Sequence, residues 1–350
     1  MVRGRITLTE GVGRPDRGDP VDSSTVTHVG APGCPPSISV VICAYSEARW
    51  NDLLEAIASI QRQRLPALDT IVVIDHNEAL RERVEREVAG IVVIENVEQR
   101  GLSGARNSGI RIARGDVVAF MDDDAMAAPD WLECLADGYA NARVIGVGGS
   151  IIPLWEQGRP RWFPEEFDWV IGCTYRGMPE RTATVRNMIG CNMSFRREVF
   201  ATVGGFAHGI GRLGTRPLGG EETEICIRAL RRWPDRSILY EPSATVHHRA
   251  PAGRGTLGYF RSRCYSEGLS KAVISKLVGA GDALATERGY AVRTLGSGVL
   301  RNLGASVRQR DVHALQRAGA IVTGLAFTTA GYVVGAVSGR PLVSTVTEEL

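Results

Sequence analysis

Residues 117–124 read Val117-Val118-Ala119-Phe120-Met121-Asp122-Asp123-Asp124, an apolar run that ends in three adjacent carboxylates. An apolar run without polar alternation predicts a strand that is buried on both faces of a sheet. Adjacent carboxylates repel one another and lose hydration when enclosed, so a cation beside them would stabilise them. Mg²⁺ and Mn²⁺ bind carboxylate oxygens and keep positions for phosphates, which predicts a metal–diphosphate site here. A solvated acidic turn, with Asp124 or Asp130 capping the next helix, is the alternative.

Strands and helices alternate around this segment. Apolar runs predict buried strands at 38–44, 71–74, 91–94, 117–121 and 144–152. Helical spacing and caps predict helices from Trp50, at 78–88, at 103–114 with Ser103 as its cap, and from Pro129 to about Tyr139. This order predicts an α/β fold with a doubly wound, mostly parallel sheet. Because ligands bind beyond the carboxyl ends of such strands, we expect the polar groups at 44–47, 75–77 and 122–124 on one rim.

Composition is that of a soluble globular protein. The chain has 350 residues, 44% apolar and 23% charged, and its net charge of +2 does not indicate a nucleic-acid partner. The seven cysteines are scattered without a C-x-x-C pair, which indicates neither a disulfide framework nor a zinc site. No basic-then-apolar leader opens the chain, so we expect a cytoplasmic protein. Residues 1–36 lack periodicity and predict a flexible tail.

The C-terminal part predicts helices beyond Pro251, with one at 266–278. No charged residue occurs between Arg317 and Arg340, but five glycines and three threonines dilute the apolar character. The spacing Gly331-x-x-x-Gly335 suits close helix packing in a membrane or in a soluble core. We expect a buried helix, with peripheral membrane contact through 318–339 as the alternative. An aromatic loop at 153–190 suits either an acceptor or a core role.

Several motifs in order resemble the inverting family 2 glycosyltransferases of the GT-A fold. The segments that carry the resemblance are the strand and turn Val40–Glu47, the strand Ile71–Asp75, the G-x-x-x-A-R-N-x-G run Gly101–Gly109, the DXD-like Phe120–Asp124, the acceptor-side strand Gly190–Arg197, the turn Val203–Phe206 and the G-E-D-like Gly220–Glu224. Together these motifs lie within residues 38–250. The resemblance implies a GT-A domain at 37–250, with a nucleotide-sugar half at 37–150 and an acceptor half at 151–250. Residues 251–350 would then form a helical C-terminal extension.

The resemblance also implies the reaction and its residues. A divalent metal, Mg²⁺ or Mn²⁺, would assist transfer from a nucleotide-diphosphate sugar to a hydroxyl of a glycan, lipid or secondary metabolite. The residues implied to bind the donor are Ala44, Tyr45, Glu47, Asp75, Arg106, Asp122 and Asp123. The implied metal ligands are Asp122, Asp124 and His248. Glu222 matches the catalytic base and Glu221 precedes it, so which of the two takes the proton stays open.

Departures from the family pattern keep alternatives open. His76-Asn77 follows Asp75 where the family commonly has Asp and Gly, and Glu222 replaces the commoner aspartate. Ala229 stands where the Gln of a Q-x-x-R-W element would be, so processive polymer synthesis is not expected. The alternative classes are a sugar-phosphate nucleotidyltransferase and a non-catalytic carbohydrate-binding protein. A dinucleotide oxidoreductase is disfavoured because no G-x-G-x-x-G follows the first strand.

Overall fold

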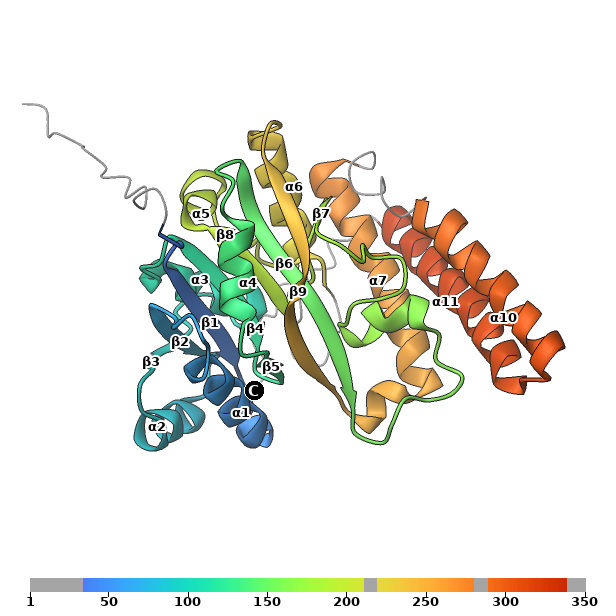
Figure 1. Ribbon diagram of the computed structural model, residues 1–350, viewed down its shortest axis with the longest axis horizontal. Coiled ribbons are helices and arrows are strands. Elements are labelled where there is room, and N and C mark those ends of the chain that lie inside the picture. The colour runs from blue at the N-terminus through green and yellow to red at the C-terminus, as the bar shows by residue number, and fades with distance from the viewer. Residues whose placement is uncertain (1–33, 211–218, 280–288, 339–350) are drawn as a thin grey trace, which may run out of the picture.

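The computed structural model describes residues 34–210, 219–279 and 289–338, and residues 1–33 of the predicted tail lie outside this range. The described part contains one nine-stranded sheet of order β3-β2-β1-β4-β8-β6-β9-β5, with β7 beside β9 (Figure 1). The strands are β1 Ile38–Ala44, β2 Asp69–Ile74, β3 Val92–Glu95, β4 Val117–Asp122, β5 Ala125–Ala127, β6 Val144–Trp155, β7 Ala183–Val185, β8 Asn192–Arg196 and β9 Ser237–Ala250. All five predicted strands are therefore present.

The predicted α/β fold is confirmed, and its parallel character is concentrated in the first half of the sheet. Strands β1, β2, β3 and β4 pair in parallel, whereas β8 runs antiparallel to both β4 and β6. Strand β9 is parallel to β6 and antiparallel to β5 and β7. The first four strands are joined by crossover helices, which impose parallel pairing, and the loop-rich segment between β6 and β8 imposes no such constraint.

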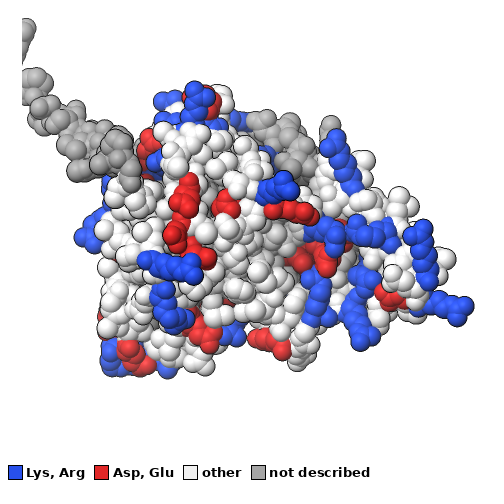
Figure 2. Space-filling view, viewed as in Figure 1, with Lys and Arg blue, Asp and Glu red and all other residues white. Residues whose placement is uncertain are grey.

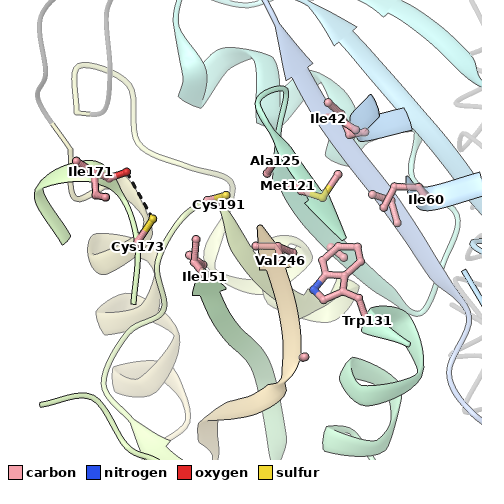
Figure 3. Packing of buried hydrophobic residues seen from close by; sticks show 14 of the residues in the cluster. Ile42, Ile60, Met121, Ala125, Trp131, Ile151, Ile171, Cys173, Cys191 and Val246 are labelled. Carbon is pink, nitrogen blue, oxygen red and sulfur yellow. Dashed lines mark hydrogen bonds between the residues drawn. The ribbon is translucent and has the colours of Figure 1, made fainter. Parts of the chain in front are cut away.

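Helices cover both faces of the sheet because successive side chains of its central strands point to opposite sides. Val40 and Ile42 of β1 belong to one buried cluster and Val41 to another. Figure 3 shows part of the first cluster, where Met121 of β4 lies among apolar side chains that include Trp131 of α4. Three helices contribute to the first cluster: α1 Trp50–Gln61, α2 Glu78–Glu87 and α4 Trp131–Gly138. Three others contribute to the second: α3 Leu102–Ile112, α5 Arg197–Val203 and α6 Glu221–Arg232.

Three long helices follow the sheet at the side of the molecule opposite β1–β3 (Figure 1). They are α7 Leu257–Val278, α10 Gly296–Gln309 and α11 Val312–Val337, and short helical turns occur at η1 Glu47–Arg49, η2 Glu165–Ile171, η3 Ala252–Gly255 and η4 Tyr290–Leu295. A Cβ on Gly331 of α11 would lie 2.0 Å from the Tyr265 carbonyl oxygen, and one on Gly268 of α7 would lie 2.1 Å from that of Thr328. The predicted close packing at Gly331 is thus confirmed, and its partner is α7.

Helix α11 has an apolar surface that the described fold leaves uncovered. It is long and apolar enough to cross a membrane, and only 28% of its most apolar window is buried. The expectation of a buried helix is therefore wrong for most of its surface. Exposed apolar side chains on α10 and α11 include Leu300, Val307, Val322, Val333 and Val337.

The aromatic loop contributes mostly to packing. Trp155 and Trp162 contact Phe163, with ring centroids 5.3 Å apart in both pairs, and Phe163 contacts Phe260 of α7. These rings join the main apolar cluster, so Trp155 and Trp162 stabilise the attachment of α7 to the sheet domain.

Candidate functional site

Pairing of β5 with β9 places His248 beside the acidic end of β4. Asp122 is the last residue of β4, and after Asp123 and Asp124 the chain enters β5 at Ala125. Ala125 pairs directly with His248 of β9. As a result His248 Nε2 lies 3.0 Å from Asp124 Oδ1, although more than a hundred residues separate them in the chain.

Asp124 is buried among basic side chains. Besides His248, its carboxylate lies 3.2 Å from Arg49 Nη1 and 3.5 Å from Arg254 Nη2. Burial alone would raise the pKa of Asp124, but His248, Arg49 and Arg254 together hold it well below its ordinary value. Asp124 is therefore a fixed carboxylate anion.

Asp123 has only one of its carboxylate oxygens paired. Oδ1 accepts a hydrogen bond of 2.7 Å from Arg49, while Oδ2 is buried without a hydrogen-bond partner among the described residues. Burial raises the pKa of Asp123 to about 7, against the attraction of Arg49. Arg49 thus links η1, after β1, to the end of β4.

Asp122 belongs to a possible ligand cluster with Cys191 and His248. Ligand atoms of Asp122, Cys191 and His248 lie within 4.8 Å of one another, and the Asp122 side chain is 32% exposed. Burial raises the pKa of the Cys191 thiol well above its ordinary value, so it is a neutral thiol and a poor ligand for a hard ion. Asp122 and His248 supply a carboxylate and an imidazole, donors that suit Mn²⁺. Asp124, the third predicted ligand, contacts His248 but does not belong to this cluster.

Arg106 connects the two acidic clusters. It is buried in the second turn of α3, where Nη1 donates a 2.8 Å hydrogen bond to Glu221 Oε1 and Nη2 donates to the Gly190 carbonyl. Nη2 also lies 3.7 Å from Asp122 Oδ1. Glu221 Oε2 has no hydrogen-bond partner among the described side chains and backbone groups. A single guanidinium therefore fixes the beginning of α6 relative to the end of β4.

Glu222 follows a turn that requires glycine. Gly220 has φ +102°, and a Cβ there would lie 2.4 Å from Ile274 Cδ1. This turn begins α6 and directs the half-buried Glu222 side chain into a cavity. Burial and, secondarily, the charge of Glu221 raise the pKa of Glu222 to about 8. A carboxyl group with such a pKa is suited to accept a proton near neutral pH.

Asp75 lies at the C-terminal end of β2, where the surrounding backbone holds its carboxylate. Oδ2 accepts a 2.9 Å hydrogen bond from the Gly101 amide, and Oδ1 accepts a 2.7 Å hydrogen bond from Asn96. His76 Nδ1 also lies 2.9 Å from Oδ1, and His76 adopts φ +53°. The contact between the Asp75 carboxylate and the His76 ring thus stabilises the strained backbone of His76.

Ala44, Tyr45 and Glu47 lie at the end of β1, next to the Asp75 turn. Tyr45 is exposed, and its carbonyl accepts a hydrogen bond from Asn77. Ala44, Tyr45 and Glu47 share the expected rim with Asp75 and Asp123. None of these five residues lines the cavity that contains Glu222. The structure therefore brings Asp122, Glu221, Glu222, Arg106 and His248 together around one cavity, with the β1–β2 residues beside it.

The cavity has a volume of about 440 Å³, and its lining also includes residues that the sequence motifs did not indicate. Arg254 enters it from η3, and α7 contributes Arg263, Glu267 and Lys271. These three α7 residues were missed from the sequence. Their spacing of four residues could have indicated a shared helix face, but Arg263 lies before the predicted helix 266–278. Helix α11 contributes Leu325, Thr328, Thr329 and Tyr332.

Comparison with known proteins identifies the chain's family. The profile described as Glycosyl transferase family 2 matches residues 39–204. The glucosyl-dolichyl phosphate glucuronosyltransferase of Haloferax volcanii is 38% identical over 244 residues, which are 69% of this chain and 78% of the relative. This chain belongs to glycosyl transferase family 2. The succinoglycan biosynthesis protein ExoM of Rhizobium meliloti is 24% identical to this glycosyltransferase over 237 residues, 66% of this chain and 72% of that one.

A solved structure confirms the fold. The mannosyltransferase PcManGT of Pyrobaculum calidifontis, in complex with GDP-Man and Mn²⁺, superposes with a TM-score of 0.55 at 18% identity, covering 88% of this glycosyltransferase and 89% of that chain. The predicted GT-A fold, family and enzyme class are thereby confirmed. The family decides against the nucleotidyltransferase and the non-catalytic binding protein that the sequence left open.

Proposed function

We propose that this glycosyltransferase moves a sugar from a nucleotide-diphosphate sugar to an acceptor hydroxyl, with a divalent ion and with inversion at the anomeric carbon. The observation that carries the proposal is that Asp122, His248 and the Glu221–Glu222 pair line one cavity. An ion site and a proton acceptor on the same cavity suit a single displacement, because the ion would stabilise the leaving group and the carboxylate would take the proton of the attacking hydroxyl.

Asp122, Asp124 and His248 would hold Mn²⁺ or Mg²⁺. Asp124 Oδ1 already lies 3.0 Å from His248 Nε2, so these two donors would be close together before an ion binds. When bound, the ion offsets the negative charge that develops on the leaving diphosphate. The Mn²⁺ and GDP-Man in the mannosyltransferase of the same fold support this assignment.

The nucleotide would lie on the rim formed by the ends of β1 and β2. Ala44, Tyr45 and Glu47 border this rim, and Asp75 is held there by the Gly101 amide and Asn96, so its orientation is fixed before the donor binds. We assign Asp123 and Arg106 to the diphosphate side, because Arg49 and Glu221 respectively fix them next to Asp122 and Asp124.

Glu222 is the proposed base. The acceptor oxygen attacks the anomeric carbon as the bond to the diphosphate oxygen breaks, and the hydroxyl proton passes to the Glu222 carboxylate. Attack from the side opposite the leaving group inverts the anomeric configuration. Glu221 stays paired with Arg106, and its negative charge beside Glu222 increases the affinity of that carboxylate for the proton.

A lipid-linked acceptor and a membrane surface complete the proposal. The name of the Haloferax relative contains a dolichyl-phosphate sugar, which supports an acceptor of that class. The segment 318–339 would provide the membrane contact through the exposed apolar side chains of α11; its last residue lies outside the described residues. Residues 289–310 contain four arginines and no acidic residue, and Figure 2 shows basic side chains over this end of the molecule. Such charge suits the anionic cytoplasmic face of a membrane.

A thermal-shift titration tests the ion and donor assignments. The protein would be screened with nucleoside diphosphates in the presence of Mn²⁺ or Mg²⁺, and the best nucleotide then used as its sugar derivative in a transfer assay. We expect H248A to lose the Mn²⁺-dependent stabilisation and H247A, a neighbouring histidine that does not line the cavity, to retain it. Chelation that leaves both nucleotide binding and turnover unchanged would refute the metal assignment. A product with retained anomeric configuration would refute the single displacement.

A further inference from the structure

A row of charged side chains on α7 lies in the cavity and has no part in the steps above. Arg263, Glu267 and Lys271 follow one another at intervals of four residues, so they share one helix face. Arg263 Nη1 lies 3.0 Å from Glu267 Oε2, and Lys271 Nζ lies 3.3 Å from Glu267 Oε1. Two cations thus share one carboxylate. All three side chains line the cavity and are at most 22% exposed.

This row is close to the proposed base. Arg263 Nη2 lies 3.3 Å from the position that a Cβ on Gly219 would occupy, and Gly219 precedes the turn that carries Glu222. The guanidinium also lies over the Trp169 ring, 5.8 Å from its centroid. Trp169 and Glu267 limit the positions that the guanidinium can take. A ligand group held by Arg263 would therefore lie on the acceptor side of Glu222.

From these contacts we infer that Arg263 and Lys271 form a subsite for the phosphate of a lipid-linked acceptor. The inference rests on the proposed function and specifies its acceptor. A guanidinium has five N–H donors, so Arg263 can bind a phosphate oxygen while it keeps its bond to Glu267. Lys271 adds a second positive charge on the same helix face, one turn beyond Glu267.

The apolar wall of the same cavity selects a lipid over a free phosphate. Leu325 of α11 lines the cavity and is 41% exposed, so this wall continues to the outer surface of the protein. Along α11 that surface carries Val322 and Val333, which are also exposed. A prenyl chain attached to a phosphate at Arg263 could follow α11 outward and bury apolar area that is otherwise in water.

Direct binding tests the subsite without any need for turnover. Geranyl phosphate, geraniol and inorganic phosphate would each be titrated calorimetrically against the full chain. We expect geranyl phosphate to bind most tightly, and R263Q and K271M each to weaken it by about 10- to 100-fold, the effect of losing one hydrogen bond between charged groups. The matched control is R261Q, on the same helix but outside the cavity, and it should bind as the wild type does.

The outcomes separate the components of the inference. Equal affinity for geraniol would show that the phosphate is not recognised, and equal affinity for inorganic phosphate would show that the lipid is not. Either result overturns the assignment, as would R263Q and R261Q weakening binding alike. R263K and K271R keep the charges, so restored binding in these variants supports the subsite even if R263Q folds poorly. A failure of the proposed function is distinguishable, because it would appear as absent metal-dependent donor turnover in the wild type.

Discussion

Glutamine in place of Glu222 preserves the shape of the side chain and removes its charge and its ability to accept a proton. Burial and Glu221 raise the pKa of this carboxyl from 4.5 to about 8. At about 1.36 kcal/mol for each pKa unit, the 3.5 units between these values place an upper limit of about 5 kcal/mol on the cost of holding Glu222 charged in the folded protein. Glu222 is therefore a group that the fold keeps at the expense of stability.

The sign of the pH dependence follows from the raised pKa. The folded protein binds this proton more tightly than the unfolded chain, so its contribution to stability is complete below about pH 4.5 and is lost as the pH rises through about 8. Glutamine has no such loss. We expect E222Q to match the wild type in Tm near pH 4.5 and to exceed it by up to about 6 °C near pH 9, for an unfolding entropy of about 2.1 cal/mol/K per residue.

Activity should change in the opposite direction. Removal of a general base lowers kcat by about 10²- to 10⁴-fold, so E222Q should be nearly inactive with saturating donor. In the wild type, kcat/KM should rise with pH as Glu222 loses its proton near pH 8. E224Q is the matched control for stability, because Glu224 accepts a 2.7 Å hydrogen bond from Arg228 Nη2 and its neutralisation should lower Tm. Near wild-type turnover by E222Q, or a Tm that falls as in E224Q, would refute the reasoning.

Three other substitutions test the remaining parts of the structure. R106M leaves Glu221 buried without its cation, and urea unfolding should show a loss of about 3–5 kcal/mol that R106M/E221Q partly restores; no recovery in the double variant would contradict the pairing. G331A places a Cβ 2.0 Å from a carbonyl oxygen of α7 and should lower Tm, whereas G319A, with nothing within 4 Å, should leave or raise it. V333D, at an exposed position of α11, should weaken sedimentation with anionic vesicles at least about tenfold, and unchanged sedimentation would refute the membrane contact.

The sequence was sufficient for those parts of the fold that depend on local pattern. The apolar runs correctly indicated β1, β2 and β4, because strands buried on both faces need no polar alternation. Local rules were less accurate where tertiary contacts decide. Ser103 does not cap α3; its hydroxyl donates to the Ile210 carbonyl, and Gly101 occupies the cap with φ +125°. Helix α7 confirms the prediction of a helix beyond Pro251; it contains the predicted helix 266–278 and begins nine residues earlier, at Leu257.

The candidate site was predictable in composition but not in its contacts. The run of three aspartates and the Glu221–Glu222 pair were visible, because acidic residues next to strand ends and glycines form local patterns. The contact between Asp124 and His248 depends on β5, a three-residue strand too short to predict, which pairs with β9 far along the chain. The bond from Arg106 to Glu221 spans 115 residues and depends on how α6 docks against α3. Such contacts depend on how distant elements are arranged in the fold, and the hydrophobic periodicity of a short segment carries no information about that arrangement.

The charges around the aspartates show why ion and donor should bind together. Adjacent carboxylates repel one another, yet in the folded protein Arg49 contacts both Asp123 and Asp124, and Arg254 approaches Asp124. Since these cations already offset much of the negative charge, the acidic run alone attracts an ion only weakly. A donor diphosphate adds negative charge and oxygen ligands on the open side of Asp122. The ion should therefore increase the affinity for the nucleotide, and by linkage the nucleotide must increase the affinity for the ion by the same factor.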